Sequence, residues 1–269
     1  MRCAAALLAL LFAPVAAHAQ EVAPPPKAEP RFCPNRPDLG SGACTTDPGR
    51  VLLEFSALDW QRQRGGGSKV DDIRIGDLLA RTGIDNRTEL QLSAAVVGIV
   101  RERGDTRRSA TSVGDLRVAV RRNVRNPDGD GLAIAIEPFA VLPTGKQPIG
   151  AGDWAAGVAL PIGYDLGGRW SLGFTGELAA AVDGDGEGRH ASVLGILGLG
   201  YAITSTVGVV GEVALRRDSD PAGATTEAAT ALSLAWEPRP GLQWDVLAVA
   251  GLNRSSPDFR FAIGGAILF

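Results

Sequence analysis

Apolar and polar residues alternate along most of this chain, and the alternation recurs in short segments. From Val51 onward, segments of about ten to fourteen residues are separated by clusters of Gly, Asp, Asn or Pro. Each segment has the two-residue period of a β-strand with one polar and one apolar face. We count twelve segments: 51–61, 70–80, 88–98, 115–121, 132–142, 154–164, 170–182, 191–202, 207–216, 227–236, 242–252 and 259–269.

These segments predict a membrane barrel rather than a soluble sheet. In 88–98, Leu90 and Leu92 alternate with Glu89 and Gln91. Beyond the first twenty residues, no run of eighteen apolar residues predicts a spanning helix. A soluble β-sandwich is the alternative, but an open sheet of this size leaves edges exposed. We therefore predict an all-β fold, a closed antiparallel transmembrane β-barrel of about 12 strands.

The connections between segments alternate in length. Counting from a periplasmic start, odd connections such as 62–69, 100–112 and 143–153 are long and charged. Even connections such as 165–169 are mostly tight, although 122–131 is not. Long outer loops, short periplasmic turns and an even strand number are typical of bacterial outer-membrane barrels.

Aromatic residues fit the same arrangement. Every Trp and Tyr lies near a predicted strand end, as in the aromatic girdles at a membrane interface. We place these residues as follows: Trp60 and Trp154 at the outer end, and Tyr164, Trp170, Tyr201, Trp236 and Trp244 toward the periplasmic end. The last segment alternates from Phe259 to a terminal Phe269 and resembles the sorting signal of the barrel-assembly machinery.

The N-terminal residues are predicted to lie outside the barrel wall. Arg2, an apolar run and Ala17-His18-Ala19 predict a signal peptide at 1–19, and hence Sec export. Residues 20–49 are rich in Pro and predict a semi-extended periplasmic segment, with the barrel following at 50–269. Cys33 and Cys44 are candidates for a disulfide in an oxidising periplasm; two free thiols are the alternative.

The strand phases place charged side chains inside the barrel. The predicted lumen-lining residues are Glu54, Arg74, Arg117, Glu137, Glu177, Glu212 and Arg216. One interpretation is an interior ion-pair network that compensates buried charge and sets the strand register. The other is a charged pore with polar selectivity. Twelve strands enclose more space than side chains fill in an eight-strand barrel, so we expect some open lumen.

Other chemistries find less support. His190 and Ser192 resemble the outward-facing His-x-Ser pair of lipid A deacylase barrels, but no carboxylate follows at the usual distance, so we predict no catalytic residues. The acidic loop 183–187 has only half of a calcium-ligand set, and we predict no metal site and no cofactor. A net charge of −3 argues against a nucleic-acid partner.

Several stretches resemble a known family. RPDLGSGACTTDPGRVLLEFSALDW, TELQL, GDLRVAVRRN and EPFAVLPTGK are similar to the phenol meta-pathway transporters, the outer-membrane family of the MetA-pathway phenol degradation type. The resemblance covers about 36–269 and implies a barrel that moves small, often hydrophobic or aromatic, molecules across the cell outer membrane. It supplies no binding residues.

The sequence leaves two functions open. The first is a channel for uptake or efflux of a small-molecule solute; the second is a structural or adhesive barrel whose lumen is plugged, for example by the Pro-rich segment. The expected partners are outer-membrane lipids and lipopolysaccharide, with the barrel-assembly machinery and periplasmic chaperones during biogenesis.

Overall fold

Thirteen strands and the turns between them account for nearly all of the chain after Arg50. A computed structural model describes residues 29–269, and residues 31–269 form one compact unit. The predicted signal peptide and residues 20–28 lie outside the described residues. The strands are β1 (Val51–Gly65), β2 (Ser68–Asp85), β3 (Thr88–Arg103), β4 (Arg107–Ser112), β5 (Leu116–Arg125), β6 (Leu132–Leu142), β7 (Ala155–Gly167), β8 (Trp170–Val182), β9 (Arg189–Ala202), β10 (Val207–Asp218), β11 (Thr225–Arg239), β12 (Leu242–Gly251) and β13 (Phe259–Leu268).

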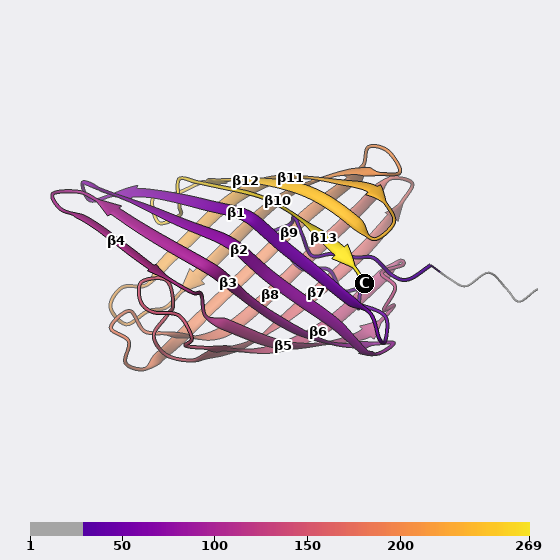
Figure 1. Cartoon of the computed structure of the whole chain (residues 1–269), viewed down its shortest axis with the longest axis horizontal. Helices are drawn as coiled ribbons and strands as arrows, with labels where there is room; N and C mark the ends of the chain where they lie inside the picture. The colour runs from indigo at the N-terminus through magenta and orange to yellow at the C-terminus, as the bar shows by residue number, and fades with distance from the viewer. Residues whose placement is uncertain (1–28) are drawn as a thin grey trace, which may run out of the picture. The chain divides into compact units, whose positions relative to one another are not determined.

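The sheet closes on itself. Each strand pairs antiparallel with its neighbours, and β1 pairs with β13 from Leu52↔Leu268 to Arg62↔Phe259 (Figure 1). β4 and β5 count as one wall strand, because β3 pairs with β4 in one half and with β5 in the other. The prediction of a closed barrel of 12 strands is therefore confirmed. None of the described residues forms a helix long and apolar enough to cross a membrane.

The alternation seen in the sequence decides which side chains face lipid. On β9 and β10, Val193, Leu197 and Val213 are about half exposed on the outer face, whereas Ile196 and Glu212 are buried inside. Lipid accepts the apolar outer face, and every ladder hydrogen bond is made within the closed sheet. This barrel spans the outer membrane.

We call the end of the barrel where β1 begins and β13 stops the terminal end, and the opposite end the distal end. The backbone groups of Val51 and Phe269 hydrogen-bond to each other at the terminal end. Outward aromatic side chains lie near this end, with Trp170 against Tyr201 and Phe55 against Trp244. Near the distal end, the rings of Trp60 and Phe259 are 6.1 Å apart. The two aromatic levels agree with the sequence prediction.

Two predicted outer loops are wrong. Residues 62–69 and much of 100–112 continue the strands, so that β1, β2, β3 and β4 reach beyond the other strands at the left of Figure 1. The β1–β2 turn needs only Gly66 and Gly67, whose positive φ values of 57° and 79° suit a tight hairpin turn. The polar sequence misled the prediction because this hairpin extends past the lipid and has no apolar face to show.

A bulge also corrects the phase of β1. Regular alternation from Glu54 puts Leu58 inside, but the β1–β13 register shifts between Ser56 and Leu58. Beyond the shift, Asp59 faces the lumen and is buried against Arg260 of β13. A bulge adds one residue to a strand and reverses its faces, which hydropathy alone does not reveal.

Candidate functional site

The lumen contains a second element besides the wall. Residues 31–49, which we call the plug, run inside the barrel before β1 begins. The Glu89 carboxylate accepts a hydrogen bond from the backbone N–H of Thr46 at 2.7 Å. The Glu212 carboxylate accepts two more, from the N–H groups of Leu39 at 2.7 Å and Gly40 at 3.0 Å. Carboxylates on opposite parts of the wall therefore hold one segment.

The plug differs from the predicted periplasmic segment at 20–49. Residues 31–49 of that segment lie inside the barrel among inward-facing side chains. These side chains make hydrogen bonds to backbone groups that a Pro-rich segment with many turns cannot bond within itself. Cys33 and Cys44 are joined by a disulfide that closes this segment into a compact loop. The Arg36 side chain also pairs with Asp245 of β12 at 2.7 Å and donates to the hydroxyl of Ser56.

One side of the lumen carries a chain of alternating charges, which we call the charge ladder. Four carboxylates and three guanidinium groups from β1, β2, β3, β5, β6 and β8 are linked in sequence. The ion pairs are Glu54–Arg81 at 3.0 Å, Arg81–Glu89 at 3.0 Å, Glu89–Arg121 at 3.4 Å, Arg121–Glu137 at 2.7 Å, Glu137–Arg117 at 3.0 Å and Arg117–Glu177 at 3.8 Å.

The charge ladder and the plug stabilise each other. Arg81 and Arg121 are fully buried, so each guanidinium needs partners for most of its donors. Arg81 donates to the backbone carbonyls of Cys33 at 2.9 Å and Cys44 at 3.1 Å. Arg121 also donates to the Cys44 carbonyl. The plug thus completes the hydrogen bonding of two buried cations.

The remaining predicted lumen residues also face inward but lie apart from the ladder. Arg74 of β2 pairs with Asp72 at 3.5 Å near the distal end. Arg216 of β10 lines a cavity with Glu227 and forms no ion pair among the described residues. The structure therefore divides the predicted set: four of the seven belong to the ladder, Glu212 binds the plug, and two lie nearer the distal end.

Asp38 lies where the plug meets β10 and β11. Burial and repulsion from Glu212 raise the pKa of Asp38 to about 7. The Ser233 hydroxyl donates to Asp38 at 3.0 Å and acts in the opposite direction. A carboxyl group at the lumen therefore changes charge near neutral pH.

The wall opposite the ladder is lined by glycines. Gly163 of β7, Gly173 of β8 and Gly208 of β10 face inward, and a Cβ atom built on any of them meets nothing within 4 Å. Gly198 and Gly200 of β9 lie between them. Where the wall has no side chains, the plug leaves space between itself and the strands.

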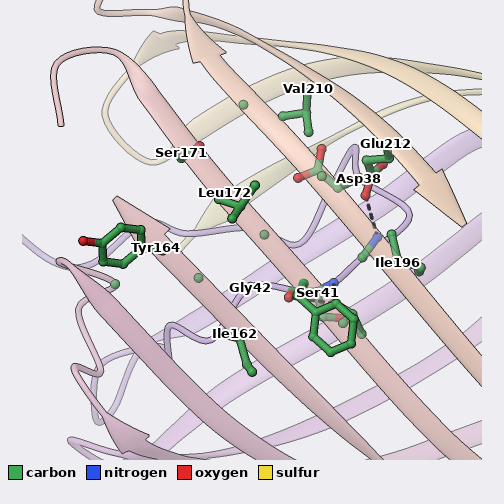
Figure 2. Close-up of a pocket in the computed structure, with 18 of the residues that line it drawn as sticks. Asp38, Ser41, Gly42, Ile162, Tyr164, Ser171, Leu172, Ile196, Val210 and Glu212 are labelled. Atoms are coloured by element: carbon green, nitrogen blue, oxygen red, sulfur yellow. Dashed lines mark hydrogen bonds between the residues drawn. The ribbon is translucent and has the colours of Figure 1, made fainter. Parts of the chain in front are cut away.

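Three cavities occupy this space. A cavity of about 230 Å³ lies beside plug residues Asp38 and Ser41 (Figure 2). It shares Asp38 and Gly200 with a cavity of about 360 Å³ toward the terminal end. It shares Ile196 with a cavity of about 420 Å³ toward the distal end. The three cavities follow one another along β8–β11, and we call them the lateral passage.

Comparison with known proteins shows the family of this chain. The profile of the family described as "Putative MetA-pathway of phenol degradation" matches residues 34–269, nearly the whole described chain. The chain belongs to this family. No curated protein matches its sequence.

Solved barrels share the family member's architecture. The translocator domain of the autotransporter NalP from Neisseria meningitidis is 13% identical with a TM-score of 0.52, over 83% of this chain and 90% of that one. The NanC porin is 12% identical with a TM-score of 0.49, over 78% and 99% of the two chains. The KdgM porin is 11% identical with a TM-score of 0.48, over 79% and 98%. At these identities the likeness concerns the fold alone.

The hydrolase hypothesis finds no support in this family member. His190 and Ser192 are buried on the inner face of β9, alternating with the lipid-exposed Val193. The imidazole lies against Asp183 at 2.9 Å and Asp218 at 2.6 Å. A pair that acts on lipid would have to face lipid, as the deacylase comparison requires.

The same histidine is part of a group with potential metal-ligand atoms. His190, Asp218 and Asp220 place one such atom each within 4.8 Å of the others. Both imidazole nitrogens already face carboxylates, and Asp220 accepts backbone hydrogen bonds from Gly184 and Ala222. The contacts join two distal loops. In the acidic loop, Asp185 accepts the N–H of Glu187 and forms a turn.

The sequence analysis missed Arg81, the central cation of the ladder. The predicted strand ended at Ala80, one residue too early. Extending the strand to the turn at Asn86 would have included Arg81, but regular alternation from Arg74 would have placed it on the outer face, because Gly76 interrupts the pairing of β2. The partners of the plug left no comparable signal, because Leu39 and Glu212 are 173 residues apart.

Proposed function

We propose that this protein is a passive outer-membrane channel for small molecules, narrowed by its plug to the lateral passage. The observation that carries the proposal is the series of three cavities that share lining residues and follow residues 36–42 of the plug. The glycine-lined wall keeps this side open, while the charge ladder fills the opposite side. Uptake and efflux are both compatible with such a passage.

The lining of the passage has apolar and charged parts. Leu39, Leu194 and Val249 line the distal cavity, and Val210 lines both other cavities. Charged groups lie among them, including Arg216 and Glu227 in the distal cavity. The apolar part, together with a family description that refers to phenol degradation, favours hydrophobic or aromatic solutes that also carry a polar group.

Filling the glycine wall tests the proposal directly. We expect Gly173→Phe to lower single-channel conductance and phenol flux in planar bilayers and proteoliposomes by several-fold. Gly173 faces the passage and has free space beyond it. The matched control is Gly211→Phe, because Gly211 is exposed on the outer face of β10, away from the lumen, and also has free space around it. Equal conductance of both variants and the unmodified protein would contradict the passage.

The alternative is a structural or adhesive barrel with a closed lumen. The hydrogen bonds between the plug and Glu54, Glu89 and Glu212 favour it, since they hold the plug in place. Removal of residues 31–47 separates the two functions. A channel conducts before the deletion and conducts more afterwards; a plugged structural barrel shows no conductance or phenol flux until the plug is removed.

Biogenesis partners belong to the same proposal. The backbone bonds between Phe269 and Val51 close the sheet. The alternating apolar residues of β13 support recognition by the barrel-assembly machinery, with periplasmic chaperones carrying the chain to it.

A further inference from the structure

The extended hairpins of β1–β4 carry a basic surface on the outer face of the barrel. Residues paired across an antiparallel sheet share a face. The pairs Arg62↔Asp71 and Asp71↔Arg101 form one row, and Arg64↔Lys69, Lys69↔Arg103 and Arg103↔Arg107 form the next row toward the tip. Six cations and one carboxylate lie in these two rows, although the whole chain has a net charge of −3.

The row beneath the cations is apolar. Trp60, Ile73 and Ile99 are paired in register, two residues closer to the lipid-facing wall. Trp60 belongs to the distal aromatic level, where its ring lies 6.1 Å from that of Phe259. Aromatic girdles mark the boundary between acyl chains and head groups. The basic rows therefore begin at the height of the head groups of the outer leaflet.

One buried carboxylate organises the cations. Asp71 is 4% exposed and accepts hydrogen bonds from Trp60 at 3.1 Å and from Arg62 at 2.7 Å. Lys69 and Arg103 each approach Asp71 to 3.8 Å. Arg62 also lies over the Trp60 ring, 4.5 Å from its centre. These contacts fix the cations without neutralising them.

A cavity lies at the junction of the two surfaces. It has a volume of about 310 Å³ and is lined by apolar Leu58, Trp60 and Ile73, by the cations Arg62, Arg101 and Arg103, and by the carboxylate of Asp71 that Arg62, Lys69 and Arg103 share. Arg101 forms no ion pair in the described part of the chain, and its side chain is exposed. Guanidinium groups present forked donors that match the oxygens of a phosphate. The cavity combines phosphate-binding groups with a surface for an acyl chain.

We propose that this surface binds a phosphorylated glycolipid of the outer leaflet. Its phosphate lies on Arg62, Arg101 and Arg103, and its first acyl segment lies against Leu58 and Ile73. The site is on the outside of the barrel, so it is independent of the proposed passage. The site binds both the charge and the apolar part of the glycolipid, and a free anion offers only the charge.

The test uses the refolded full-length mature protein in detergent and three probes. The probes are diphosphorylated lipid A, the same glycolipid with its phosphates removed, and inorganic phosphate; binding is measured by native mass spectrometry and titration. We expect R62Q/R101Q/R103Q to bind diphosphorylated lipid A at least tenfold more weakly. The control R87Q/R125Q/R239Q changes the same charge on exposed arginines near the terminal end and should bind normally.

The other arms decide between sources of the same chemistry. Weak binding of the dephosphorylated glycolipid by the unmodified protein supports the proposal, and binding equal to that of lipid A contradicts it. Full competition by millimolar inorganic phosphate would assign the site to free anions and overturn it. Heat-modifiable migration checks that each variant folds. If the triple variant does not fold, R101Q alone tests the same point, since Arg101 has no ion pair to lose within the described chain. A tenfold affinity is about 1.4 kcal/mol.

Discussion

The two halves of the lumen are built from opposite kinds of residue. On the side of β1–β6, buried Arg and Glu side chains form the charge ladder and bond to the plug. On the side of β7–β10, glycines face inward and the lateral passage remains open. The same strand geometry thus yields a filled half and an open half. The difference lies only in the side chains at alternate positions.

This contrast underlies the proposal that a barrel containing a plug still conducts. A plug held evenly around its circumference would close the lumen. Here the ladder bonds to the plug through Glu54, Arg81, Glu89 and Arg121, whereas, among the described residues, the strands of the glycine wall bond to it only through Thr175 and Glu212. Selectivity then depends on the shape of the remaining space. The stability of the barrel and its conductance should therefore respond to different substitutions, and four predictions test this.

The largest effect is expected from Arg81→Ala in the filled half. The substitution leaves Glu54 and Glu89 buried without their shared cation, and two plug carbonyls without a donor. Removing one partner of a buried pair costs about 3–5 kcal/mol. We expect a lower urea midpoint in detergent and incomplete heat-modifiable folding. The control is Arg216→Ala, which faces the open half; a loss of similar size there would contradict the comparison.

The disulfide comes next. Replacing Cys33 and Cys44 by Ser opens the plug loop, which costs the docked plug about 2–3 kcal/mol if chain entropy dominates. The ladder keeps its ion pairs, so the urea midpoint of the wall should fall less than in Arg81→Ala. We expect faster proteolysis within residues 31–47 and frequent conductance steps above the unmodified level. An unchanged trace, with the barrel folded, would show that the disulfide does not hold the plug.

Thr175 tests the contact of the plug with the open half. Its hydroxyl accepts from the Ser41 N–H at 2.8 Å and donates to the Ser41 carbonyl at 3.2 Å. Thr175→Val removes both bonds and should cost about 1–2 kcal/mol of plug docking. A modest rise in conductance is expected. Ser192→Ala is the control, because Ser192 faces inward on β9 without a hydrogen bond to the plug.

The last prediction is a pH dependence. The pKa of Asp38 is raised to about 7 in the docked plug, against an ordinary value of 3.8. The docked plug binds the extra proton, so its stability falls as pH rises between these values and is constant above about 7. Asp38→Asn should remove this dependence and hold the plug more firmly at pH 8. Glu212, Asp245 and Glu54 also repel the Asp38 charge. A pH dependence that persists in Asp38→Asn would therefore assign the titration to these carboxyl groups instead.

The sequence predicted the wall better than its contents. Alternation predicts Glu137 and Glu212 inside, and both are buried in the structure, because one face of each strand must meet lipid. Alternation does not hold past Ser56, where a bulge reverses the faces of β1, or past Gly76, which is unpaired with both neighbouring strands. It also could not show which inward charges would meet. Arg81, for example, is linked to Glu137 through Glu89 and Arg121, which lie on two other strands. Such contacts depend on how the strands are arranged around the barrel and not on local periodicity.

The predicted Pro-rich segment shows the same limit more strongly. Its composition indicates irregular backbone but not the groups that will satisfy it. Asn123 donates to the carbonyl of Ala43, and Gln243 donates to that of Arg36. These residues are 80 and 207 positions from their partners. No motif within the segment indicates which distant residues will bond to it.

The plug has a mechanical consequence as well. A closed sheet is stiff along its strands, but its cross-section can flatten when the surrounding bilayer presses on it. The plug bonds to Glu54 on β1, Glu89 on β3, Glu212 on β10 and Asp245 on β12, and therefore braces the ring from within. Lateral pressure that makes the ring oval must stretch this brace. The bonds that hold the plug therefore also resist flattening of the open half.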